Sequence, residues 1–270
     1  MDTAYDHELI AALLQWQAEL GADEALGEAP VNRYDLPAEA ARPAAVAKAE
    51  RPAPAAPPPA TTTAADPVEL ARSLAEGADD LDALAAVQAE YEHCDLRRGA
   101  QSFVFSDGRA GARVMILGEA PGRDEDLQGK PFVGRAGQLL DRMFAAIGMG
   151  RDAPDIARAL YISNILPWRP PGNRNPAPGE MAMMLPFVRR HVELAAPDVL
   201  ILMGNTPCSA ILGQHGITRL RGKWTEALGR PVLPMFHPAY LLRNPHAKRQ
   251  AWEDLLALQA RLREGEGNVG

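Results

Sequence analysis

Carboxylate, amide and imidazole side chains stand directly after four apolar, strand-like runs of this sequence. The segments are GEAPGRDED at 118–126, SNILPWRPPGNR at 163–174, GNTP at 204–207 and HPAYLLR at 237–243. A carboxylate orients or deprotonates water, an imidazole donates or accepts a proton, and an amide offers donors and an acceptor to a polar ligand. Gathered in one cleft, these groups are suited to hydrolysing a bond in a polar substrate.

The first segment combines a turn-forming backbone with acidic side chains. Gly118, Pro121 and Gly122 favour a tight loop whose amides face one small group. Glu119 and Glu125 lie in the same segment, and neither a GxGxxG nor a GxxxxGK[ST] spacing is present. Taken alone, the stretch is also compatible with a plain strand-to-helix turn that carries a solvated acidic tail.

The other segments supply a histidine, an asparagine and several basic side chains. His237 follows an apolar strand and precedes Pro238, although a lone histidine is more often structural. Asn164 offers one acceptor and two donors, which suits recognition of a base edge. Arginine and lysine suit phosphate groups, although each one singly is more often a solvated charge. The candidates for contact with a nucleic-acid backbone are Arg169, Arg174, Arg221, Lys223 and Arg243.

Strand-like runs alternate with helical patterns through the second half of the chain. The strand-like runs lie at 113–117, 160–166, 198–203 and 231–236, and the helical patterns at 137–148, 178–195, 206–213 and 246–263. Strands separated by helices pair in parallel through right-handed crossovers, and ligands bind at their carboxyl ends. The sequence therefore predicts an α/β fold with three α/β/α layers around a short central parallel four-stranded sheet.

The first 67 residues differ in composition from the rest. Residues 1–36 carry an amphipathic helical segment, which either docks on a protein partner or packs on its own body. Residues 37–67 are rich in Pro and Ala and predict a disordered linker. Residues 68–270 are then the catalytic domain, and the helical pattern at its start covers about 67–92.

Charge and cysteine content limit the class of protein. The net charge is −7, but residues 1–90 carry 17 acidic and 5 basic side chains, whereas 91–270 carry 18 and 23. The body is thus mildly basic, as a partner of a polyanion requires. Two cysteines cannot form a four-thiolate metal site. The acidic start argues against a signal peptide, and the lack of a long apolar stretch argues against a membrane span. We therefore expect a cytoplasmic protein.

The order of the motifs resembles that of the iron–sulfur (family 4) uracil-DNA glycosylases. GEAPGRDED is followed by GKPFVGRAGQLLD, an asparagine before RPPGNR, RGKW and HPAYLLRNP, over roughly residues 88–262. The resemblance implies a monofunctional enzyme that flips uracil out of DNA and hydrolyses its N-glycosidic bond, which initiates base excision repair. It also implies uracil-containing DNA as the partner of a monomer associated with the bacterial nucleoid.

The resemblance assigns the catalytic groups. Glu119 and Glu125 are nominated to stabilise the sugar cation and to orient water, with Glu119 favoured. His237 is nominated to donate a hydrogen bond to uracil O2 as the base leaves.

The resemblance also assigns the groups that hold the base. Phe132 stacks on the flipped uracil, and Asn164 binds its N3 and O4 edge. The backbone of Gly118 and Ala120 holds the base or the water.

Two departures from the family pattern are visible. In register, the four iron–sulfur ligand positions fall on Tyr91, Cys94, Trp168 and Met184, so only one cysteine is kept. We therefore expect no metal and no 4Fe-4S cluster, with apolar packing in its place. Ala239 stands where many relatives have serine. These departures leave open an alternative, a catalytically weak or inactive DNA-binding or damage-sensing module on the same fold.

Overall fold

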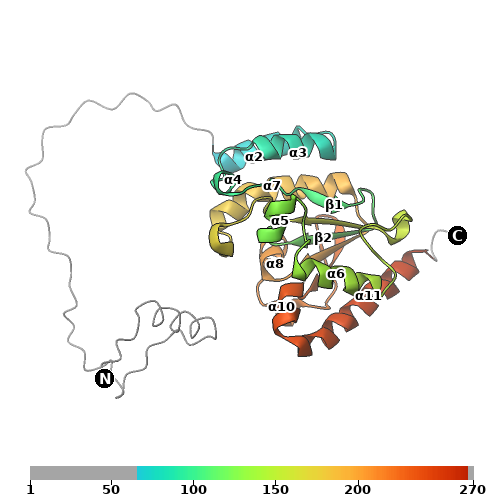
Figure 1. Cartoon of the computed structure of the whole chain (residues 1–270). Helices are drawn as coiled ribbons and strands as arrows, with labels where there is room; N and C mark the ends of the chain where they lie inside the picture. Colours follow the sequence, from blue (N-terminus) through green and yellow to red (C-terminus); the bar gives the residue numbers. More distant parts are fainter. Residues whose placement is uncertain (1–65, 267–270) are drawn as a thin grey trace, which may run out of the picture. The chain divides into compact units, whose positions relative to one another are not determined.

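One six-stranded sheet forms the centre of the described part of the chain, residues 66–266 of a computed structural model (Figure 1). The predicted N-terminal helix and nearly all of the predicted linker lie outside the described residues. The strand order is β1-β3-β2-β4-β6-β5. The strands are β1 (Ser106–Gly108), β2 (Val114–Gly118), β3 (Leu160–Asn164), β4 (Val199–Met203), β5 (Thr225–Ala227) and β6 (Arg230–Met235).

The four central strands are parallel, as predicted. β2 pairs with β3 on one side and with β4 on the other, and β4 pairs with β6. The sequence did not predict β1 and β5, which pair antiparallel at the two edges. Each of these edge strands has three residues, which is too short to show an alternating pattern.

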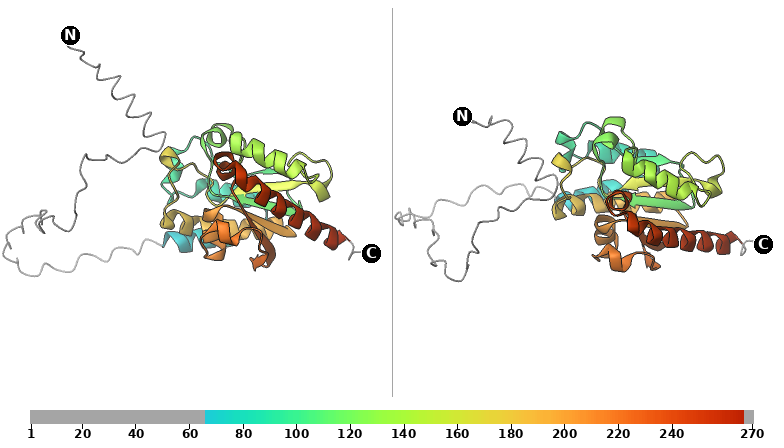
Figure 2. Two further views of the ribbon diagram at one scale, coloured as in Figure 1. Left: turned by 90° about the horizontal axis from the view of Figure 1, so that it is seen from below. Right: turned by 60° about the horizontal axis from the view of Figure 1, so that its bottom comes forward.

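Helices cover both faces of the sheet and make the three layers. α6 (Arg135–Ala145) and α11 (Lys248–Glu266) lie side by side on one face (Figure 2), and α7 (Pro178–Ala195) and α8 (Asn205–Leu212) cover the other. The shortest helical elements are α4 (Leu96–Gly99), α5 (Arg123–Gln128), η1 (Ile156–Arg158), η2 (Pro171–Asn173), α9 (Ile217–Leu220), α10 (Pro238–Arg243) and η3 (Pro245–Ala247). Burial on both faces explains why the parallel strands read as continuous apolar runs.

The predicted single helix over 67–92 is wrong, because the chain forms two helices there. α2 (Pro67–Glu76) ends at Gly77, and α3 (Leu81–Glu90) begins after Asp80, whose carboxylate accepts a hydrogen bond of 2.8 Å from the Ala83 amide. A side-chain cap of this kind starts a new helix where the preceding one has stopped. Both helices pack on the side of α7 that faces away from the sheet (Figure 1).

The parallel strands deliver all four predicted segments to one end of the sheet. Glu119 follows β2, Ile165 follows β3, Gly204 follows β4 and His237 lies two residues after β6. The backbone ladder continues past the strand ends, since the Leu166 amide donates to the Glu119 carbonyl at 3.0 Å. Among residues 66–266, no helix combines the length and apolar character required to cross a bilayer.

Candidate active site

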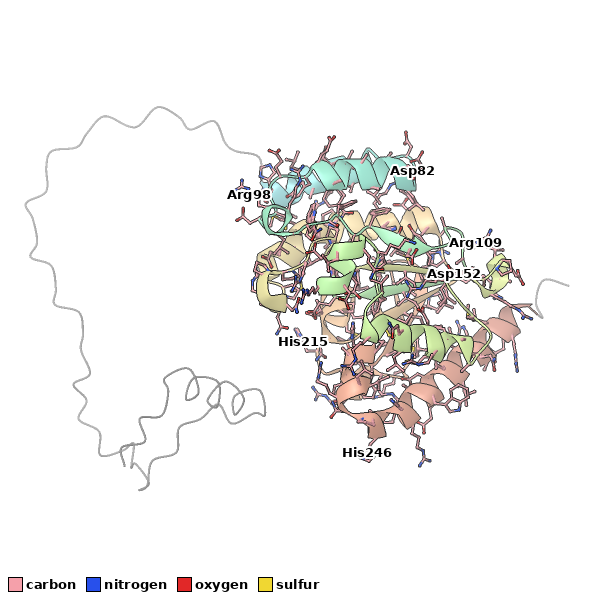
Figure 3. All side chains as sticks on the ribbon, in the orientation of Figure 1. Asp82, Arg98, Arg109, Asp152, His215 and His246 are labelled. Atoms are coloured by element: carbon pink, nitrogen blue, oxygen red, sulfur yellow. The ribbon has the colours of Figure 1, made fainter. Side chains whose placement is uncertain are left out.

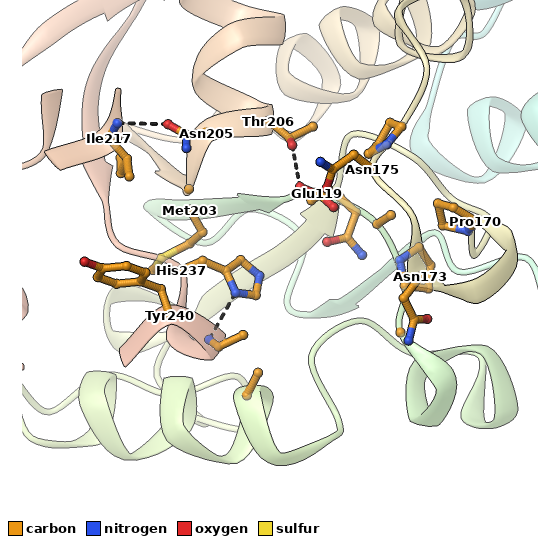
Figure 4. A pocket seen from close by; sticks show the side chains of 18 of the residues that line it. Glu119, Pro170, Asn173, Asn175, Met203, Asn205, Thr206, Ile217, His237 and Tyr240 are labelled. Carbon is orange, nitrogen blue, oxygen red and sulfur yellow. Dashed lines mark hydrogen bonds between the residues drawn. The ribbon is translucent and has the colours of Figure 1, made fainter. Parts of the chain in front are cut away.

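A cleft of about 770 Å³ lies at the carboxyl ends of the parallel strands (Figure 4). Residues of all four predicted segments line it, although the first and the last segment are more than a hundred residues apart in the sequence. The predicted residues that line it are Glu119, Ala120, Glu125, Phe132, Asn164, Arg174, His237 and Arg243. His215 lies at the same end, whereas Arg109 and Asp152 lie together at the other end of the sheet (Figure 3).

The acidic run after Gly122 is helical, and most of its carboxylates bind backbone amides. Glu125, on α5, accepts from the amides of Gly122, Val133 and Gly134 at 3.1, 3.0 and 2.9 Å. Asp126 is buried and accepts from two amides of the 101–102 segment. The alternative of a solvated acidic tail is therefore wrong for these two side chains, because both hold neighbouring segments in place.

Glu119 is placed differently from Glu125. Its partly buried carboxylate lines the cleft and accepts a hydrogen bond from the hydroxyl of Thr206 on α8 (Figure 4). One oxygen is thereby oriented by the protein, and the carboxylate stays next to the space that a substrate would fill. Of the two predicted catalytic carboxylates, Glu119 has the geometry for contact with a substrate or water, and Glu125 has the geometry for holding the loop.

His237 is held in one tautomer by the backbone. Its Nδ1 accepts a hydrogen bond of 3.1 Å from the Ala239 amide (Figure 4), so the proton of the neutral ring is on Nε2. Burial, together with the charge of Arg243, lowers the pKa of His237 to about 4. The ring is therefore neutral near pH 7 and offers an Nε2–H donor. Because position 239 contributes only its backbone amide, Ala in place of Ser leaves this hydrogen bond unchanged.

Phe132 and Asn164 both approach Gly118, the last residue of β2. The Phe132 ring centroid is 5.4 Å from that of His237, with 29° between the ring planes. A Cβ at Gly118 would come within 2.4 Å of Asn164 Oδ1 and 2.6 Å of the Phe132 ring, so only glycine permits this approach. Asn164 Nδ2 is buried and has no hydrogen-bond partner within the part of the chain that the structure describes.

Four of the predicted DNA-binding side chains are at the surface or partly buried. Arg243 and Lys223 are exposed, and Arg243 lines the cleft. Arg174 is exposed and forms two hydrogen bonds with Glu180, at 2.9 and 2.5 Å. Arg169 is partly buried and donates to Asn173 at 2.8 Å. All four remain candidates for contact with phosphate groups.

Arg221, the fifth, has a structural partner. Its guanidinium binds the buried carboxylate of Asp254 on α11, with Nε 2.9 Å from Oδ2, and donates to the Gln250 carbonyl at 2.7 Å. It also lies over the Phe236 ring, 5.9 Å from the centroid. These contacts hold Arg221 against α11, and breaking the pair with Asp254 would leave an uncompensated buried charge, at a cost of about 3–5 kcal/mol. A phosphate contact by Arg221 stays a prediction, and it would have to form beside this pair.

Several residues of the cleft were not predicted as site residues. Thr206 binds Glu119, and Asn205 Oδ1 accepts from the amides of Gly216 and Ile217 at 3.2 and 2.8 Å (Figure 4). The GNTP segment had been noted for its position after a strand, but a threonine gives no signal of its partner until the fold is known. Tyr240 also lines the cleft.

The comparisons identify the family. A family profile described as "Uracil DNA glycosylase superfamily" matches residues 105–256, which include the acidic segment 118–126, Asn164 and His237. The chain belongs to the uracil DNA glycosylase superfamily. The resemblance noted in the sequence is thereby confirmed, and so are the α/β/α fold and the enzyme class, uracil-DNA glycosylase.

Similar curated proteins carry the name type-4 uracil-DNA glycosylase. The protein of Thermotoga maritima is 38% identical over 154 residues, which cover 56% of this chain and 77% of that protein. The protein of Archaeoglobus fulgidus is 36% identical over 170 residues, or 60% and 82% of the two chains. The protein of Saccharolobus solfataricus is 34% identical over 185 residues, or 65% and 83%.

The four positions that are in register with iron–sulfur ligand positions of the family lie in one buried cluster of this chain. Tyr91, Cys94, Trp168 and Met184 have at most 2% of their surface exposed, and Tyr91 packs edge-on against Phe187 at 5.4 Å. Three of these side chains cannot act as thiolate ligands, and burial raises the pKa of the remaining Cys94 thiol. The residues present therefore do not fit a four-thiolate cluster. No group of three or more metal-ligating side chains occurs among residues 66–266.

The first prediction from the site concerns stability against pH. Burial lowers the pKa of His191 to about 3 and that of His237 to about 4, whereas an unfolded histidine titrates near 6.5. Between pH 6.5 and 4 the unfolded chain binds more protons than the folded chain, so the free energy of unfolding falls as pH falls. Each histidine adds a slope of up to about 1.4 kcal/mol per pH unit. Urea unfolding between pH 7 and 5 measures this slope, and His237→Gln is expected to reduce it. An unchanged slope in His237→Gln would contradict the assignment.

The second prediction concerns Thr206 as a positioning residue for Glu119. Thr206→Val keeps the shape of the side chain but removes the hydroxyl, so the carboxylate loses its donor. We expect single-turnover excision of uracil to fall about tenfold, which corresponds to about 1.4 kcal/mol. Thr206→Ser restores the hydroxyl and is expected to recover most of the rate. Equal rates for the Val and Ser variants would show that the hydrogen bond is not used.

Proposed function

We propose that this enzyme is a monofunctional glycosylase that flips uracil out of DNA and hydrolyses the bond between the base and deoxyribose. The observation that supports it most is Asn164 Nδ2, a buried donor in the cleft without a partner in the described residues. A buried unpaired donor costs about 1–3 kcal/mol, so a ligand with a matching acceptor binds strongly there. Uracil O4 is such an acceptor.

Discrimination against cytosine follows from the same side chain. Nδ2 of Asn164 donates to uracil O4, and its Oδ1 accepts from N3–H. Cytosine places an amino group where uracil has O4, so two donors would face each other and the amide would stay unpaired. Phe132 stacks on the flipped base, which contributes roughly 1–3 kcal/mol and offsets the few kcal/mol that flipping costs.

The leaving base and the sugar need opposite electrostatic support. As the C1′–N1 bond breaks, its electron pair goes to the uracil, which leaves as an anion, while positive charge develops on the sugar. His237 Nε2–H donates to uracil O2 and stabilises this anion. The carboxylate of Glu119 stabilises the sugar cation, orients the water whose oxygen bonds to C1′, and accepts the proton that this water loses. Within residues 66–266, no lysine lines the cleft, which favours water over an amine as the nucleophile.

The remaining functional predictions concern the DNA and the cell. Arg243, Arg174, Arg169 and Lys223 bind phosphate groups, so binding weakens steeply as salt rises. The enzyme acts as a monomer in the cytoplasm, at the nucleoid, and its abasic product enters base excision repair. The N-terminal segment, residues 1–36, recruits a protein partner.

The test of the proposed function is excision from a labelled oligonucleotide that contains one uracil, followed by alkaline cleavage. Asn164→Ala and His237→Ala are each expected to lower single-turnover excision by at least about tenfold, or about 1.4 kcal/mol. His93→Ala, an exposed histidine outside the cleft, is the matched control and is expected to keep the wild-type rate. DNA binding without any abasic product would instead support the damage-sensing module, and wild-type rates in both variants would overturn the site.

We also propose that the enzyme works without an iron–sulfur cluster. The support is the packing of Tyr91, Trp168 and Met184 around a single protonated thiol. Protein purified from iron-replete cells is expected to contain little iron or acid-labile sulfide, and chelator treatment is expected to leave excision unchanged. Stoichiometric iron with visible charge-transfer absorption, lost together with excision, would overturn this proposal.

A further inference from the structure

Arg151 is a partly buried arginine outside the cleft that none of the sequence motifs includes. Its side chain is 10% exposed, and it follows Gly150, which pairs with the start of β3 through Leu160 N at 3.1 Å. Its neighbour Asp152 lies at the end of the sheet away from His215 (Figure 3). Arg151 does not line the cleft, and it contacts the cleft residue Phe132 through the backbone.

The guanidinium of Arg151 binds the two carbonyl groups on either side of the Phe132 Cα. Nη1 donates to the Pro131 carbonyl at 2.9 Å, and Nη2 donates to the Phe132 carbonyl at 2.8 Å. Two carboxylates complete its surroundings: Nη1 is 2.9 Å from Asp107 of β1, and Nε is 2.9 Å from Asp141 of α6. One side chain thus ties an edge strand, a helix and the loop before that helix together.

Phe132 has a backbone conformation that needs such support. Its φ is +54°, in the left-handed region that non-glycine residues rarely adopt and that costs about 1–2 kcal/mol. Its carbonyl lies so close to α6 that a Cβ at Gly137 would be 1.8 Å from the oxygen. The carbonyl is therefore held between a glycine of α6 and the fork of Arg151, and the direction of the Phe132 ring follows from this backbone.

The charges around Arg151 are balanced locally. Lys130, two residues before Phe132, lies 3.4 Å from Asp107, so the loop reaches the same carboxylate through a second cation. Burial alone would raise the pKa of Asp107, but hydrogen bonds from Arg151 and the Gly108 amide outweigh it, and the net pKa is lowered. Asp107 therefore stays ionised near pH 7 and keeps Arg151 in place.

We propose that Arg151 is a positioning residue that sets the Phe132 ring as the stacking platform for the flipped base. This inference rests on the proposed function, since it assigns the platform to uracil. A planar guanidinium can serve four acceptors in fixed directions, whereas a lysine ammonium on a flexible stem cannot reach all of them. Arg151 does not touch the substrate, so its effect on excision must pass through Phe132.

The test compares Arg151→Lys with wild type, and Arg158→Lys is the matched control. Arg158 is 71% exposed and lies 4.0 Å from a single carboxylate, that of Asp155. Arg151→Lys is expected to lower single-turnover excision about tenfold and to raise the inhibition constant of free uracil by a similar factor. Affinity for DNA without uracil is expected to change less than about twofold, because phosphate contacts are untouched. Arg158→Lys is expected to behave as wild type in all three measurements.

A double-mutant cycle separates positioning from general destabilisation. The Phe132→Leu substitution already removes the aromatic ring. In that background, adding Arg151→Lys is expected to lower excision by less than about twofold more. Independent, additive losses would overturn the proposal, as would wild-type uracil inhibition in Arg151→Lys. If Arg151→Lys does not fold, Asp141→Asn weakens the same network at a carboxylate that is 46% exposed, and a smaller loss in the same direction is expected. Absence of excision in wild type would instead contradict the proposed function itself.

Discussion

A single carboxylate, that of Glu125, joins the two chain segments on which the candidate active site is built. It accepts hydrogen bonds from Gly122, at the end of the loop between β2 and α5, and from Val133 and Gly134, just after the predicted platform residue Phe132. Bonds between backbone amides and an ionised carboxylate are about twice as strong as neutral ones. The loop that carries Glu119 and the turn that carries Phe132 are therefore fixed relative to each other before any DNA arrives.

The cleft is electrically divided because the parallel sheet brings different chemistry to each strand end. The carboxylate of Glu119 follows β2. The amide of Asn164 lies at the end of β3, and the imidazole of His237 follows β6. A site for heterolytic cleavage of a glycosidic bond needs both signs a few ångströms apart. Backbone amides hold both kinds of group: the Ala239 amide fixes the imidazole tautomer, and the amides of Val133 and Gly134 bind the Glu125 carboxylate.

The sequence was sufficient for the four parallel strands and for the chain segments that meet at the cleft. Continuous apolar runs located the four parallel strands, and the rule that parallel strands share their carboxyl ends gathered Glu119, Asn164 and His237. It could not separate the roles of Glu119 and Glu125, because those depend on which amides each carboxylate meets across a turn. Nor could it predict the partners of Arg221 or Arg151, which lie in distant elements.

The amide nitrogen of Asn164 connects the stability of the fold with the proposed specificity. Among the described residues this buried group has no hydrogen-bond partner, so the residue proposed to bind the base edge is also a local source of instability. A substitution that removed the amide would relieve this cost and would also remove the proposed contact with the base. Selection for heat resistance alone would therefore favour losing Asn164, and keeping it is the cost in stability that the proposed role requires.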